Sequence, residues 1–376
     1  MRSFCVSVLP LLALSLVACG SAPDTSADTT EDLKGPGKLA TDQRVPELNG
    51  DPTIVHTSKI DMASAIANAQ SKGPIIEAKF EIGDDKNLSL SLYPVKDIAL
   101  DSERNVFQEV SYNPTQLHSK QNLDTFTDQE HLTRSSRDLT LIQLSSKTLA
   151  DAALDWSWQG SVYWAIPTIR KGRAGYGVYV LDCNDTTRWH FVDGEGASFR
   201  TSQHPQDLGE GPGADATDSR SPELGNDLGI LAQSKITMSQ ALAQLEPKHG
   251  PAIEAKFEIG DDKKLSLSIY PTGKGIGVDA ERNTFFEAAG DPTQASFNPD
   301  VSEFKVPDAE HLTRSARDLT LVQTASLTLR EAVSAAQKMV PGGIVYWAIP
   351  TIRNVRSGYG VYVYGADKKS HYFFVS

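Results

Sequence analysis

Residues 75–94 read IIEAKFEIGDDKNLSLSLYP, and this stretch decides the fold. Apolar and polar residues alternate with a period of two on both sides of the GDDK sequence at 83–86. Such alternation, bounded by turn residues, predicts two antiparallel strands joined by a hairpin, with one face toward a core. The stretch recurs as AIEAKFEIGDDKKLSLSIYP at 252–271, so we expect the same hairpin twice.

Two further segments recur in the same order and extend the repeat over most of the chain. They are EHLTRSSRDLTLIQ at 130–143, which returns as EHLTRSARDLTLVQ at 310–323, and VYWAIPTIR at 162–170, which returns unchanged at 345–353. We therefore expect two homologous modules, residues 51–193 and 227–376. The Gly-, Pro- and Asp-rich residues 194–226 are expected to form the linker between them.

Each module is expected to contain two related units of one helix packed on a small antiparallel sheet. Four segments place apolar residues at helical spacing directly after a residue that can cap a helix, at Asp61, Thr148, Thr237 and Thr328. Strand-like sequence follows each of them, which places the units at about 51–111, 137–193, 227–290 and 317–376. The expected fold class is α+β, with two tandem homologous domains that are each a pair of such units.

The closing sequences of the first and third units carry a family resemblance. They are LDSERN at 100–105 and VDAERN at 278–283. Behind a capped helix and three strands, this ending resembles that of the PepSY domain, with Asn in place of the family's usual Gly. The second and fourth units match the family in layout. The resemblance implies a domain of exported and cell-envelope proteins and peptidase propeptides, which binds or restrains peptidases and has no shared catalytic residues.

The N-terminus indicates export and a lipid anchor. Residues 1–18 contain Arg2 and an apolar run that is too short to span a bilayer, which is typical of a cleaved signal peptide. The run ends in Leu16-Val17-Ala18-Cys19, which resembles the lipobox of bacterial lipoproteins. The resemblance implies that Cys19 carries acyl chains such as palmitate and anchors the protein to a membrane. The alternative is an ordinary signal peptide followed by an incidental Cys.

The residues after Cys19 refine this expectation. Residues 19–50 are rich in Ser, Thr, Asp, Gly and Pro, which predicts a flexible tether. Gly20 is not the Asp that retains lipoproteins at the inner membrane, so we expect the outer membrane, facing the periplasm or the cell surface. Loss of Cys5 with the signal and acylation of Cys19 would leave Cys183 as the single remaining cysteine, so we expect no disulfide.

Charge argues against nucleic acid as a partner. The chain has 36 Lys and Arg against 48 Asp and Glu, which gives a formal net charge of −12. A phosphate backbone repels such a balance, and no local Lys/Arg cluster reverses it.

The sequence contains no recognisable catalytic or cofactor motif, so we expect a protein that is not an enzyme and binds no cofactor and no metal. His131 and His311 occupy equivalent places but have no second His or Cys at ligand spacing. The GDDK sequence offers two adjacent carboxylates without the spaced ligands of a calcium loop, and therefore favours a hairpin turn.

Two groups of residues are candidates for partner binding. The first is a set of strand tyrosines, which would suit recognition if their sheet face is open: Tyr163, Tyr179, Tyr346, Tyr362 and Tyr364. The alternative is that the sheets of a module pack these faces together.

The second group is the charged EHLTRSxRDL block, whose arginines could bind an anion or a partner: Arg134, Arg137, Arg314 and Arg317. The alternative is a self-neutralising loop that joins two units through ion pairs.

The function we expect is that of a lipid-anchored, non-catalytic envelope protein that binds a protein or peptide and restrains a peptidase. Two alternatives stay open. One is a structural envelope or surface protein without a discrete ligand. The other is a hydrolase with unrecognised chemistry, which would need a pocket that gathers acids or histidines.

Overall fold

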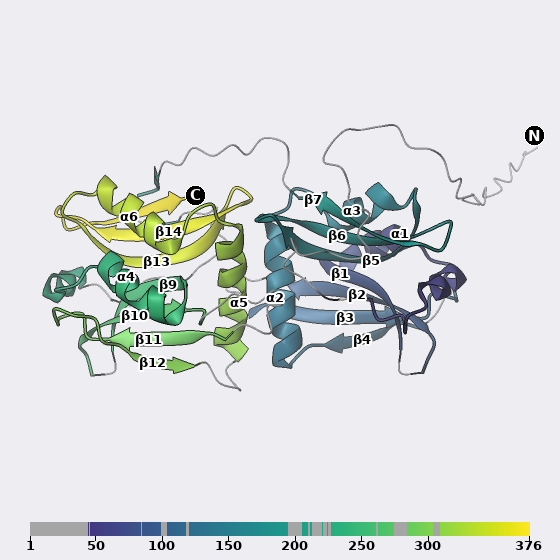
Figure 1. Cartoon of the computed structure of the whole chain (residues 1–376), viewed down its shortest axis with the longest axis horizontal. Helices are drawn as coiled ribbons and strands as arrows, with labels where there is room; N and C mark the ends of the chain where they lie inside the picture. The colour runs from purple at the N-terminus through teal and green to yellow at the C-terminus, as the bar shows by residue number, and fades with distance from the viewer. Residues whose placement is uncertain are drawn as a thin grey trace, which may run out of the picture.

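The computed structural model describes residues 44, 46–83, 85–98, 104–117, 120–194, 205–209, 211–212, 220, 224, 227–260, 262–273, 284–303 and 309–376. The protein is a mixed α and β structure built on two antiparallel sheets, one in each module (Figure 1). The predicted signal peptide, the lipobox and Cys19 lie outside the described residues.

The first sheet contains both predicted units of the first module. Its strands, in spatial order, are β4 (Asn122–Thr125), β3 (Val106–Tyr112), β2 (Leu88–Asp97), β1 (Ile75–Ile82), β5 (Gly160–Arg170), β6 (Arg173–Asp182) and β7 (Thr187–Asp193). The two units join where β1 pairs antiparallel with β5, with Ala78 opposite Ala165. The expectation of a separate small sheet for each unit is therefore wrong, since one sheet runs through the whole module.

The second sheet repeats this order and adds one strand. Its strands are β12 (Asp300–Glu303), β11 (Phe286–Gly290), β10 (Leu265–Pro271), β9 (Ala252–Ile259), β13 (Ile344–Arg353), β14 (Arg356–Tyr364), β15 (Ser370–Val375) and β8 (Gln206–Asp207). Ala255 lies opposite Ala348, as Ala78 lies opposite Ala165 in the first sheet. The added strand β8 comes from the segment that the sequence predicts to be linker.

The four predicted capped helices are confirmed. They are α1 (Met62–Ala69), α3 (Leu149–Trp156), α4 (Met238–His249) and α6 (Leu329–Met339). Each begins after the expected capping residue, whose side chain accepts a hydrogen bond from a backbone N–H of the first turn. Short 3₁₀ turns flank two of them: η1 (Pro52–Thr57), η2 (Gln70–Lys72) and η4 (Leu228–Gln233). The apolar sides of α1 and α3, and of α4 and α6, bury the main core of each module against its sheet.

The EHLTRSxRDL block forms a helix in each module and not a loop. These helices are α2 (Gln129–Gln143) and α5 (Ala309–Thr324). Leu139 of α2 packs on Ile76 and Phe107, which belong to the sheet face opposite to that of α1 and α3. Helices therefore cover both faces of each sheet.

The two modules contact each other through α2 and α5, which lie side by side at the centre of the molecule (Figure 1). Ser136 of α2 donates a hydrogen bond to the backbone carbonyl of Thr313 on α5, at 3.0 Å. One buried apolar cluster contains side chains of both modules: Leu141, Leu144, Ile169, Ala174, Leu321 and Ile352. The duplicated helix thus supplies the interface between the duplicated modules.

The ends of the predicted tether and linker belong to the folded modules. Leu48 is buried in the core of the first module, and Leu224 is buried in the core of the second. Residues assigned by the sequence to the end of the tether and to the end of the linker therefore contribute to the two cores.

In the full chain Cys183 is disulfide-bonded, and its partner lies outside the described residues. The expectation of no disulfide concerns the processed protein, which has lost Cys5 and carries acyl chains on Cys19, and it stays a prediction.

Candidate functional site

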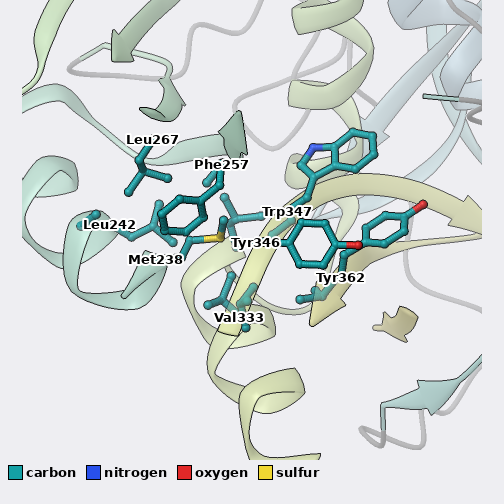
Figure 2. Close-up of a cluster of buried hydrophobic side chains, with 14 of the residues drawn as sticks. Met238, Leu242, Phe257, Leu267, Val333, Tyr346, Trp347 and Tyr362 are labelled. Atoms are coloured by element: carbon teal, nitrogen blue, oxygen red, sulfur yellow. The ribbon is translucent and has the colours of Figure 1, made fainter. Parts of the chain in front are cut away.

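The predicted tyrosine surface is not exposed. Tyr163, Tyr179, Tyr346 and Tyr362 are each at most 5% exposed, and Tyr364 is half-buried. These rings stack among core side chains, as Figure 2 shows for the second module, where Tyr346 and Tyr362 lie beside Trp347. The interpretation of these tyrosines as partner-binding residues is corrected by their burial: no open sheet face presents them.

The predicted arginine cluster is neutralised by carboxylates. Arg137 contacts Asp138 at 2.8 Å, and both side chains are almost fully buried. Arg134 lies nearer the surface and contacts Glu130 one helical turn earlier, at 2.9 Å. Their counterparts form the same pairs in the second module: Arg314 with Glu310, and Arg317 with Asp318. These arginines therefore form structural ion pairs and not an open anion site. The ion pairs lie on a helix in each module, where the sequence predicted a loop.

Arg44, which lies in the predicted tether, belongs to this network. Arg44 binds Glu77 of β1 and Asp138 of α2, both at 3.0 Å. Trp164 of β5 donates its indole N–H to the same Glu77 at 2.8 Å. This network joins two strands, a helix and the N-terminal segment of the module.

The second module repeats the network through Arg220, Glu254, Asp318 and Trp347. A sequence signal for both arginines exists. The pattern Thr-Asp-x-Arg-x-Pro-Glu-Leu occurs at 41–48 and again at 217–224. The repeat therefore extends upstream of the predicted module boundaries.

His131 and the GDDK turn make local contacts within their own segments. His131 contacts its own helix cap Asp128 at 2.8 Å and stacks on Phe126. Lys86 turns the GDDK hairpin with a positive φ of 61°, beside Asp85, whose carboxylate accepts a hydrogen bond from the backbone of Asn87. Within the part of the chain that the structure describes, no three His, Cys, Asp or Glu side chains gather closely enough to hold a metal ion.

A cavity opens in the first module where the chain passes from α2 to α3. Its volume is about 420 Å³, within the range of small-ligand pockets. Apolar side chains of α1, β1, α2 and α3 form its walls: Ile66, Pro74, Ile75, Ile142, Leu149 and Ala150. Gln70, Ser145, Ser146, Lys147 and Thr148 complete the lining. We call this cavity the α1–α3 pocket.

The rim of the α1–α3 pocket is held in place by hydrogen bonds. Tyr176 donates its hydroxyl to the backbone carbonyl of Lys147 at 2.6 Å, and Ser146 donates its own to the carbonyl of Gly194 at 2.9 Å. The Lys147 ammonium contacts Asp155 at 2.7 Å on the surface. A rim fixed in this way loses little conformational entropy when a ligand enters.

The second module has different side chains at the equivalent place. Leu327 stands where the first module has Lys147, and it packs against the apolar core. Arg330 replaces Ala150 and lies 3.7 Å from Glu246, which replaces Gln70. Burial raises the pKa of Glu246, and the neighbouring Arg330 opposes that shift. An apolar side chain and an ion pair thus occupy the positions that line the pocket in the first module.

Comparison with known proteins gives no independent assignment. No protein-family model matches the chain, and no curated protein is significantly similar to it. Among the described helices, none is both long and apolar enough to cross a membrane.

Proposed function

We propose that this protein is a lipid-anchored, non-catalytic component of the bacterial cell envelope, and that it binds a partner at the α1–α3 pocket. The partner we propose is a protein or peptide, such as a peptidase, that inserts an apolar side chain. The modules are proposed to be tandem pairs of PepSY-like units, whose family resemblance supports a peptidase as partner.

The observation that carries the proposal is the divergence of the two modules at the pocket. Both modules keep the same strand order, the same capped helices and the same buried ionic network. The second module keeps this fold with Leu327 packed on its core and Arg330 beside Glu246. The fold therefore accommodates both sets of side chains, so the residues that line the pocket in the first module are not required for folding, which favours a role in binding.

The apolar walls decide the chemistry of the ligand. Burying an apolar side chain gains roughly 1.5–3 kcal/mol, and the fixed rim keeps the opposing cost low. Lys147 lines the pocket and forms a surface ion pair with Asp155, so a polar group of the partner that approaches Lys147 meets both signs of charge. An isolated anion or metal ion would gain little from these walls.

A display library of random linear peptides, panned on the full chain, tests the proposal. We expect enriched peptides with a bulky apolar residue in common. The closing variant carries the second module's residues in the first: Gln70→Glu, Lys147→Leu and Ala150→Arg. It should weaken binding of an enriched peptide at least about tenfold in calorimetric titration, or about 1.4 kcal/mol.

The matched control carries the reverse exchange in the second module: Glu246→Gln, Leu327→Lys and Arg330→Ala. It should leave binding at the first module unchanged. If no peptide is enriched, or if enriched peptides bind the closing variant as tightly as the original chain, the α1–α3 pocket is not the binding site.

The proposed lipid anchor has its own test at Cys19. Each buried methylene of an acyl chain contributes about 0.8 kcal/mol to membrane binding, so two or three chains would anchor the protein durably. The intact mass of the chain purified from membranes should fit a start at acylated Cys19. A Cys19 found in a disulfide with Cys183 would contradict the anchor, because acylation and pairing use the same sulfur atom.

A further inference from the structure

The two sheets end differently at one edge. In the second sheet β8 lies along β15, with Asp207 opposite Phe373. Leu208 donates its backbone N–H to the carbonyl of Tyr372 at 2.9 Å, and Tyr372 donates its own to the carbonyl of Gly209 at 2.6 Å. In the first sheet the order ends at β7, with no further strand beside it among the described residues.

Strand β7 is the counterpart of β15. Trp189 pairs with Tyr179 in the first sheet as Tyr372 pairs with Tyr362 in the second, so Trp189 corresponds to Tyr372. By the same register His190 corresponds to Phe373. The backbone positions that β8 covers in the second module therefore have exact structural equivalents on β7.

The edge formed by β7 is longer than the opposite edges of the two sheets. Strand β7 is seven residues long and carries Trp189 and Phe191. The opposite edges, β4 and β12, are only four residues long, and every residue in them is exposed, so they offer little backbone for a further strand. The longer edge of β7, whose charged residues are Arg188 and Asp193, has outward N–H and C=O groups that favour the addition of a strand.

Upstream of the first module, the chain contains a sequence similar to that of β8 and the residue after it. Residues 31–33 read Glu-Asp-Leu, and residues 206–208 read Gln-Asp-Leu. Gly-Pro-Gly follows in both copies, at 35–37 and 211–213, and the Thr-Asp-x-Arg pattern comes next.

The spacing to the ionic network also agrees. Leu33 precedes Arg44 by about as many residues as Leu208 precedes Arg220, with one residue of difference. Arg44 and Arg220 occupy equivalent places in their modules, since each binds a strand glutamate and a helix aspartate. The segment between β8 and Arg220 therefore has a counterpart of nearly equal length upstream of Arg44.

We propose that Glu31-Asp32-Leu33 adds to the outer edge of β7 as an antiparallel strand, with Leu33 donating its backbone N–H to the carbonyl of Trp189. Both sheets then have eight strands. The tether between Cys19 and the folded module shortens to residues 20–30, which span roughly 40 Å at full extension. The strand pairing is inferred from the edge of the sheet, and it does not require that the α1–α3 pocket binds a partner.

Hydrogen–deuterium exchange on the full chain tests this pairing. The amides of Trp189 and Phe191 face the proposed strand, because Tyr372 donates toward β8 and strand alternation places the second residue on the same edge. We expect a peptide covering 187–193 to be protected. Leu33→Pro removes the donor and should speed exchange there about tenfold or more. Deletion of residues 31–33 should have the same effect.

Two further variants serve as controls. Leu208→Pro should expose residues 370–375 in the same way, and Ser26→Pro should leave both strands unchanged. Unprotected β7 amides in the original chain, or protection that survives Leu33→Pro while Leu208→Pro exposes β15, would overturn the proposal. Protection of β7 that rises with protein concentration would instead assign the edge to a second copy of the chain, and would also overturn it.

Discussion

Replacing Arg44 with alanine tests whether the N-terminal segment is a flexible tether or part of the folded first module. A residue in a flexible tether contributes nothing measurable to stability, whereas Arg44 binds Glu77 and Asp138 at 3.0 Å with only 12% of its side chain exposed. Removing one partner of a buried ion pair costs about 3–5 kcal/mol, because the remaining charge is left in a poor environment.

The partners that remain reduce this cost. Asp138 keeps Arg137 at 2.8 Å, and Glu77 keeps the indole N–H of Trp164 at 2.8 Å. We therefore expect the lower end of the range, about 3 kcal/mol of lost unfolding free energy. Arg44→Lys should lose less than alanine, since one ammonium retains the charge but cannot span both carboxylates as the guanidinium does.

Urea unfolding followed by tryptophan fluorescence measures this loss. Four of the five tryptophans, at 156, 158, 164 and 189, belong to the first module, so the signal reports mainly on it. The matched control is Arg173→Ala, which breaks a surface pair with Asp193 whose side chains are 48% and 33% exposed. It should cost less than about 1 kcal/mol. Equal effects of Arg44→Ala and Arg173→Ala would refute the structural role of the network.

Three further predictions concern the interface, a helix cap and pH. Leu321→Ala empties a fully buried position between the modules and should cost about 2–5 kcal/mol, with a lower urea midpoint; an unchanged midpoint would contradict the α2–α5 interface. Thr328→Ala removes the cap of α6 and should cost about 1 kcal/mol, seen as a lower Tm, whereas no shift would mean that another group caps the helix. Burial raises the pKa of Tyr163 and of Tyr176 from 10.0 to about 12, so the stability they contribute is complete below pH 10 and is lost as the pH rises through 12. Phenolate absorbance of the folded protein should show both titrating late, and titration near pH 10 would mean that the rings are accessible to solvent.

Local patterns predicted the elements of this fold well. The alternation in residues 75–94 fixes β1 and β2, since the residues that alternate to one side of these strands are those that the core buries. The cap residues fix the starts of four helices, because capping depends on the first turn alone. The candidate site was not predicted: Ile66, Ile142 and Ala150 meet at the α1–α3 pocket only after distant segments come together.

The sequence by itself determined the duplication, the strands and the capped helices, because repeats and periodicity are local properties of the chain. The tertiary structure alone decided which faces are buried. The pairing of β1 with β5 merges the units into one sheet, and α2 and α5 cover the second face of each sheet and join the modules. Those contacts bury the tyrosines and draw Arg44 into the fold, because burial depends on which elements meet in space, which local patterns do not specify.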